Sequence, residues 1–207
     1  MIRINPTLNQ EEQKLFYYGF RNAVGALRTS IFTLTSTSKD ADENLKHYVN
    51  TYVKSIEKEV MAICRRVIHI LETQIIPNTC NTVHSDAVFY QKMKGDYFRY
   101  MSEIDKTDGN ITHLAFKAYN DGLKLARESL PKMNQTRIAL SLNFSVFLVD
   151  VIGDVMGACG EVRATLKDLE GLTCPDDCVV PLQMLKDNLK LWESRSGRDM
   201  DLTECIR

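Results

Sequence analysis

Glycine and proline are scarce in this chain, which has ten glycines and five prolines among its 207 residues. Both frequencies lie below the usual values of roughly 7% and 5%. The scarcity argues against a β-sandwich or barrel, whose many turns need both residues. An excess of positive charge is also lacking, because 26 Lys and Arg face 27 Asp and Glu. We therefore expect no nucleic acid and no membrane surface among the partners, and any anion site must be a local cluster of charge.

A secretory signal and a membrane span are also absent from the pattern. No apolar run follows the single basic residue of Met1–Pro6. The most apolar stretch, Ile138–Met156, is interrupted by Asn143, Asp150 and Asp154. Three polar residues in such a span favour a buried core helix over a bilayer crossing. We expect a cytoplasmic protein.

Six cysteines are present, but they do not predict a disulfide framework. Cys64 and Cys159 lie among apolar residues in helical stretches, and a chain of this length can form a core without cross-links. Cys174 and Cys178 are four apart, and no second pair lies nearby to complete a tetrahedral zinc site. We interpret them as loop cysteines in a reducing compartment.

Apolar residues recur at three- and four-residue steps along most of the chain, which indicates helices. Asn9 with Glu12 forms a capping box, and Asn110 and Asn134 are further expected caps. Pro77 should end the second helix near Ile76. The predicted helices are 9–34, 41–76, 86–104, 110–131, one from 134 through the apolar stretch, 155–169 and one from 181.

No strand pattern accompanies these helices, so we predict an all-α fold of about seven antiparallel helices joined by short loops. We expect one domain over residues 9–193, preceded by a short segment 1–8. Residues 194–207 lack periodicity and are expected to form a flexible tail.

Motifs for catalysis or metal binding are not found. A di-iron bundle needs Glu-x-x-His, and no histidine follows a glutamate at that spacing. A glycine-rich phosphate loop and a nucleophile elbow are missing as well. The sequence indicates neither an enzyme nor a cofactor.

Two helices carry paired cations. Arg21 and Arg28 are seven residues apart, so they project from nearly the same side of the first helix. Lys92 and Arg99 repeat this spacing on the third helix, followed by Tyr100. Two helices that each carry such a pair of cations can converge on one dianion. The paired N–H groups of an arginine guanidinium match phosphate oxygens, and tyrosine adds a hydroxyl donor. From spacing alone, solvated surface charge remains the alternative.

Two later helices each carry a stripe of apolar and polar residues along one face. On one, Leu142, Val146 and Asp150 share a face, with Asn143 beside them. On the last, Asn188 and Trp192 lie one turn apart. By pattern alone these stripes are also compatible with ordinary core packing.

Four segments resemble motifs of the 14-3-3 family, and they occur in the family's order between Leu8 and Trp192. They are 21–26 (RNAVGA), 92–100 (KMKGDYFRY), 142–147 (LNFSVF) and 183–192 (QMLKDNLKLW). The resemblance implies antiparallel helices around a concave groove, and an adaptor that binds phosphoserine or phosphothreonine peptides. The alternative function is a helical scaffold that binds partners independently of phosphorylation.

The resemblance also implies roles for individual residues. Arg28, Arg99 and Tyr100 match the family's phosphate pocket, where Arg21 stands in place of a lysine. Lys92 matches the groove lysine beside it. The remaining matches are the backbone-binding Asn143 and Asn188, the apolar wall and edge formed by Leu142, Val146, Met184 and Trp192, and the acidic Asp150.

The chain departs from the family ahead of Asn9. Family members have two further helices there, which form much of the dimer interface, and this chain has eight residues. Ser30, Leu34, Tyr52 and Glu59 occupy positions that would face a partner protomer. We expect an altered or weak homodimer, with a monomer as the alternative.

Overall fold

The computed structural model describes residues 8–79 and 84–204, and the described residues are all-α. Two elements are single π-turns, η1 and η2, each continuous with the α-helix before it. The elements are α1 (Gln10–Thr37), α2 (Glu43–Ile70), η1 (Leu71–Ile75), α3 (Ile76–Thr79), α4 (His84–Ile104), α5 (Gly109–Ser129), α6 (Gln135–Phe147), η2 (Leu148–Ile152), α7 (Val155–Asp168) and α8 (Asp176–Glu204).

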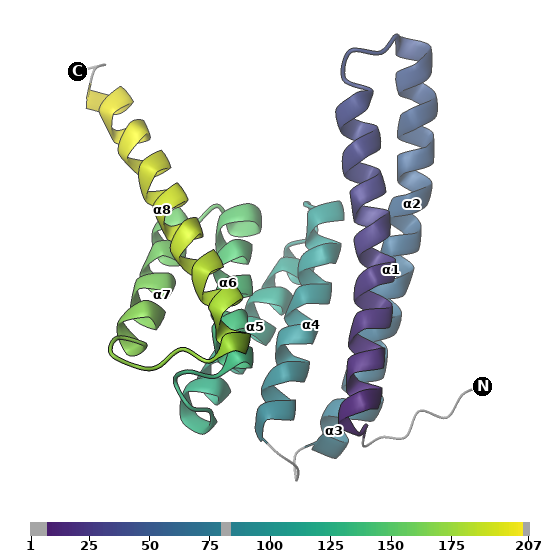
Figure 1. The fold of residues 1–207 in the computed structure, drawn as a ribbon. Helices are drawn as coiled ribbons and strands as arrows, with labels where there is room; N and C mark the ends of the chain where they lie inside the picture. Colours follow the sequence, from purple (N-terminus) through teal and green to yellow (C-terminus); the bar gives the residue numbers. More distant parts are fainter. Residues whose placement is uncertain (1–7, 80–83, 205–207) are drawn as a thin grey trace.

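The helices form an array in which neighbours in sequence pack against each other. Figure 1 shows α1 and α2 as a long antiparallel hairpin on one side, with α4 beside it. The chain then passes through α5 and α6 to α7 and α8 on the other side. With α2, η1 and α3 counted as one continuous helix, and α6 with η2 as another, the described residues form seven helices, as predicted.

One apolar core runs through the array and links distant helices. Its fully buried members include Val60 of α2, Met93 of α4, Leu140 of α6 and Leu185 of α8. Each lies on the inward stripe that the three- and four-residue spacing predicts. This shared core sets the relative positions of α1, α4, α6 and α8, which carry the candidate site residues.

Pro77 perturbs the second helix but does not end it, so the expected stop near Ile76 is wrong. Proline cannot donate to a carbonyl one turn earlier, and its ring crowds that carbonyl. Just before Pro77 the backbone hydrogen bonds change from the α-helical spacing of four residues to the π-helical spacing of five in η1. There the N–H of Ile76 donates to the carbonyl of Leu71. This π-turn accommodates the proline, and the helix continues to Thr79.

Two other helix starts differ from the prediction. Asp108, and not Asn110, caps α5, because its carboxylate accepts from the N–H groups of Asn110 and Ile111. α8 begins at Asp176, five residues before the expected start at Pro181. Acidic residues in a first turn stabilise a helix N-terminus, and α8 opens with two aspartates. The capping box at Asn9 and the cap at Asn134 are confirmed.

The last helix extends past residue 193 to Glu204, although the lack of periodicity led us to expect a flexible tail over residues 194–207. Residues 1–7 and 205–207, at the ends of the predicted segments, lie outside the described residues. The division into 1–8, 9–193 and 194–207 stays a prediction.

The apolar stretch lies in α6 and η2. Gln135–Ile152 is long and apolar enough to cross a membrane by composition, but half of this window is buried inside the fold. Core helices of globular proteins share this pattern. Among the described cysteines, Cys64, Cys159, Cys174 and Cys178 are free thiols.

Candidate functional site

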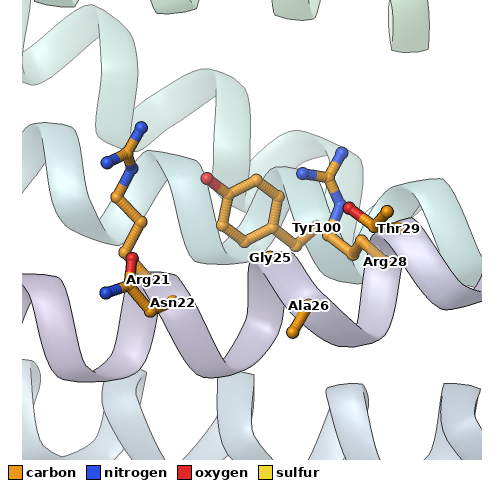
Figure 2. Close-up of a pocket in the computed structure, with 7 residues that line it drawn as sticks. All are labelled: Arg21, Asn22, Gly25, Ala26, Arg28, Thr29 and Tyr100. Atoms are coloured by element: carbon orange, nitrogen blue, oxygen red, sulfur yellow. The ribbon is translucent and has the colours of Figure 1, made fainter.

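One face of α1 opens onto a polar pocket. Figure 2 shows Arg21 and Arg28 projecting to the same side of the helix, with the hydroxyl end of Tyr100 between them. The pocket has a volume of about 380 Å³. Its lining residues are Arg21, Asn22, Gly25, Ala26, Arg28, Thr29 and Tyr100.

Glu103 joins the two arginine ridges at this pocket. The Arg28 guanidinium forms an ion pair with the Glu103 carboxylate through Nη2, and its Nε donates to the same oxygen at 3.1 Å. Arg99 donates from Nη1 to the other oxygen, Oε1, at 2.6 Å. One carboxylate therefore holds Arg28 of α1 beside Arg99 of α4.

Tyr100 lies against both arginines. The guanidinium carbons of Arg28 and Arg99 are 4.3 Å and 4.7 Å from the centre of its ring. Stacking of this kind favours a fixed guanidinium plane. Burial raises the pKa of the Tyr100 hydroxyl, so it stays protonated and can donate a hydrogen bond at neutral pH.

Arg21 is more loosely held than the other two arginines. It is exposed, and its guanidinium carbon is 5.9 Å from the ring centre of Tyr17. Arg21 and Arg28 line the pocket, and Arg99, whose side chain is 11% exposed, lies beside it and shares Glu103 with Arg28. The structure thus brings together the four residues predicted for phosphate binding.

Lys92 does not present a free charge to solvent. Its side chain is buried and forms an ion pair of 2.8 Å with Asp96, one turn along α4. Burial alone would lower the pKa of Lys92, but the adjacent Asp96 carboxylate outweighs it and raises the pKa. The nearby ring of Tyr17 lies 5.7 Å from the ammonium.

Asp96 is the centre of a buried polar network. Its carboxylate accepts from the Tyr119 hydroxyl at 2.6 Å and from the Asn143 amide at 2.7 Å, besides Lys92. Burial alone would raise the pKa of Asp96, but the charges of Lys92 and Arg99 and the hydrogen bonds from Lys92 and Tyr119 hold it below its usual range. Asp96 is therefore ionised and orients Asn143.

Tyr119 connects this network to the pocket. Its hydroxyl accepts a bond of 3.3 Å from Nε of Arg99 while it donates to Asp96. The ring packs directly on α4 at Gly95, where an added Cβ would lie only 2.7 Å from it. Glycine at position 95 is therefore required for this close approach.

The predicted groove residues lie on α6, η2 and α8. Asn143, Val146 and Asn188 are half-buried, and Met184 is half-exposed. Leu142 and Trp192 are largely covered, with 7% and 5% of their surface exposed, so little of either is available to a ligand.

Asp150, in η2, is electrostatically coupled to several arginines. Partial burial raises the pKa of its carboxyl, and the charges of Arg99, Arg195 and Arg28 act in the opposite direction. The influence of these residues places Asp150 within electrostatic range of α1, α4 and α8.

Three residues of this site were not predicted from the sequence: Asp96, Glu103 and Tyr119. A signal existed for two of them, because Lys92–Asp96 and Arg99–Glu103 have the i, i+4 spacing of helical ion pairs. No local pattern marks Tyr119, which is 23 positions from Asp96.

Comparison with known proteins agrees with these features. A family model described as 14-3-3 protein matches residues 1–193. The chain is 33% identical to 14-3-3 protein homolog 2 of Schistosoma mansoni over 207 aligned positions, which cover 95% of this chain and 96% of that protein. It is 34% identical to a 14-3-3-like protein of Fucus vesiculosus over 200 positions, covering 92% and 79% of the two chains.

The family model spans most of the chain, and the helical array carries the four motif segments in the expected order. Five of the seven residues that line the pocket, moreover, lie in two of those segments, 21–26 and 92–100. This chain therefore belongs to the 14-3-3 family of phosphopeptide-binding adaptors.

Proposed function

We propose that the protein binds segments of other proteins that contain phosphoserine or phosphothreonine, and that binding depends on the phosphate. The observation that carries the proposal is the convergence of Arg21, Arg28, Arg99 and Tyr100 on one side of α1 and α4. The guanidinium groups of Arg21, Arg28 and Arg99 suit a phosphate group, which carries about −1.5 to −2 charges at neutral pH.

The two central arginines keep donors for a ligand. A guanidinium has five N–H groups. Arg28 uses its Nε and one Nη2 donor on Glu103. Arg99 uses Nε on Tyr119 and one Nη1 donor on Glu103. Three N–H groups remain on each, and because the Arg28 side chain is 35% exposed and the Arg99 side chain 11%, Arg28 offers the more accessible donors for charge-assisted bonds to phosphate oxygens.

The asparagines supply the second part of the mechanism. An extended peptide exposes N–H and C=O groups that must be paired when it is covered. The Asn143 amide nitrogen donates to Asp96, so its carbonyl oxygen can accept from a peptide N–H. Asn188 offers a second such group from α8. In this proposal Lys92 acts through Asp96, while Leu142, Val146, Met184, Trp192 and Asp150 border the peptide.

The role is binding without catalysis, so the chain would act as an adaptor in cytoplasmic signalling. The free thiols of Cys64, Cys159, Cys174 and Cys178 are compatible with such a reducing compartment. The alternative, a phosphorylation-independent scaffold, would use the apolar border and leave the arginines unused.

We also propose a weak or altered homodimer through α1 and α2. Tyr52 is 60% exposed, and Ser30 and Glu59 are exposed on the same hairpin. Leu34 is half-buried. Tyr52 shares one face of α2 with the exposed Leu45 and Tyr48. Exposed apolar side chains grouped in this way favour a contact, and a two-fold dimer uses one patch on both copies.

A titration with one peptide in phosphorylated and plain forms tests the main proposal. We expect the phosphorylated form to bind at least tenfold more tightly by fluorescence anisotropy, with the difference shrinking as salt is added. Equal affinity for both forms would support the scaffold instead.

A further inference from the structure

Phe32 is an exposed aromatic residue on α1 for which the fold supplies no packing role. Its side chain is 73% exposed, and none of the aromatic ring contacts among the described residues involves it. The neighbouring Ile31 and Leu34, by contrast, pack against the core.

The position of Phe32 on the helix relates it to the pocket. Arg21, Gly25, Arg28 and Phe32 follow one another at steps of four, three and four, so they form one ridge along α1. The first three line the pocket. Phe32 is the next member of the ridge, one turn or about 6 Å along the axis beyond Arg28.

The same geometry separates Phe32 from the proposed protomer contact. Ser30 and Leu34 are each two residues from Phe32, which places them about 160° around the helix from it. The phenyl ring therefore lies on the ligand side of α1 and not on the side offered to a second copy.

The side chains of α1 that follow Arg28 are uncharged. The ten residues from Thr29 to Ser38 carry no charge. A ligand that places its phosphate at Arg21 and Arg28 would meet the phenyl ring of Phe32 at the next turn of α1. Such a surface favours an apolar or aromatic ligand side chain, because contact removes apolar surface of both groups from water.

We propose that Phe32 is a specificity-determining residue that selects phosphopeptides with an apolar side chain near the phosphoresidue. For a peptide segment that runs along α1 from the phosphate, an advance of about 3.3 Å per residue makes 6 Å equal to about two positions from the phosphoresidue. This inference rests on the proposed function and adds a sequence preference to it.

A peptide scan tests the inference. One phosphoserine peptide with alanine at positions −3 to +3 is compared with versions that carry a single phenylalanine at each of these positions in turn. We expect one position about two residues from the phosphoserine to strengthen binding at least fivefold in fluorescence anisotropy. Phe32→Ala should abolish that gain, and Phe32→Leu should retain part of it.

The matched control is Leu15→Ala, which also removes an exposed apolar side chain from α1. Leu15 is 75% exposed and lies about 110° around the helix from the ridge. This variant should keep the full positional preference. Circular dichroism should show unchanged helicity in the Phe32 and Leu15 variants, because neither Phe32 nor Leu15 is buried.

Two results would overturn the inference while leaving the proposed function intact: a flat positional scan in the unmodified protein, or a gain that persists in Phe32→Ala. A changed sedimentation coefficient in Phe32→Ala with an unchanged peptide preference would assign the ring to a protomer contact and also overturn it. Failure of the proposed function is distinct, because binding would then be insensitive to the phosphate itself.

Discussion

Asn143 on α6 donates a hydrogen bond of 2.7 Å to Asp96 on α4, although the two residues are 47 positions apart. Asp96 also carries the ion pair with Lys92 and the bond from Tyr119, which in turn contacts Arg99. The group proposed to hold the peptide backbone and the group proposed to hold the phosphate therefore belong to one buried network.

Replacing either central arginine should abolish most phosphopeptide affinity. We expect Arg28→Ala and Arg99→Ala each to weaken binding at least tenfold, about 1.4 kcal/mol, because charge-assisted bonds to the phosphate are lost. Fluorescence anisotropy measures the effect, and circular dichroism should show retained helicity. Arg163→Ala, which removes a surface arginine paired with Glu193 at 2.7 Å, should bind normally. Unchanged affinity in both pocket variants would refute the pocket assignment.

Asn188→Ala should weaken the phosphorylated and plain forms of one peptide by similar factors, because its proposed partner is peptide backbone. Arg28→Ala should instead act selectively on the phosphorylated form. Titration of the phosphorylated and the plain peptide against each variant gives the ratio of the two affinities for that variant. If the Asn188 variant discriminated against phosphate as strongly as the Arg28 variant, the division between charge and backbone contacts would be wrong.

Asp96→Asn should destabilise the fold by about 3–5 kcal/mol, because it leaves the buried Lys92 ammonium without its counter-charge. The pH dependence follows from the lowered pKa of Asp96. Its contribution is present above the unfolded value of about 3.9 and is lost as pH falls below it toward the folded value.

Urea unfolding at a series of pH values from neutral to acid measures both effects. The Asp96→Asn variant should be less stable than the unmodified protein at neutral pH, and the gap should narrow in acid. Asp121→Asn is the matched control, because it breaks an exposed i, i+4 pair with Lys117 and should change stability by less than about 0.5 kcal/mol. If the stability difference between the Asp96→Asn variant and the unmodified protein stayed the same at every pH, Asp96 would not be ionised as assigned.

Tyr97→Phe should stabilise the protein by about 1 kcal/mol. The Tyr97 hydroxyl is buried and is the one such side-chain polar atom without a hydrogen-bond partner among the described residues. Removing it removes an uncompensated desolvation cost and leaves the ring in place. Thermal unfolding measures the change. Tyr119→Phe serves as a contrast and should be destabilising, since that hydroxyl bonds to Asp96. A lower melting temperature for Tyr97→Phe would show that the hydroxyl is paired.

The proposed homodimer should dissociate on dilution through the micromolar range in light scattering. Tyr52→Glu should shift it further toward the monomer, because a carboxylate would be buried in an apolar contact. Met156→Glu changes an 84% exposed residue on α7 and should have no effect. A dimer that resisted both dilution and Tyr52→Glu would contradict the assigned face.

Local patterns predicted the helices well because periodic burial and capping are determined by neighbouring residues. Asn9 and Asn134 cap their helices as the sequence indicates. The wrong predictions concern positions where the sequence allows more than one local backbone structure. Asp108 takes the cap expected of Asn110, and Pro77 is accommodated by a π-turn that no spacing rule anticipates.

The arginines of the candidate site were visible from spacing and family resemblance, and the structure brings them together. The residues that hold them were not predicted as a group. Glu103 is 75 positions from Arg28, and Asp96 is 47 from Asn143. Such pairings depend on how α1 and α6 dock on α4, which the pattern of a single helix does not encode.

Because Glu103 bridges Arg28 and Arg99, one carboxylate of the protein itself is already bound to these two arginines. An aspartate or glutamate of a passing protein can offer these arginines only a second carboxylate, with the same single charge and two oxygens. A tetrahedral dianion offers a further oxygen and a further charge. Under the proposed function, a phosphate therefore gains more at these arginines than an aspartate or glutamate side chain of another protein does.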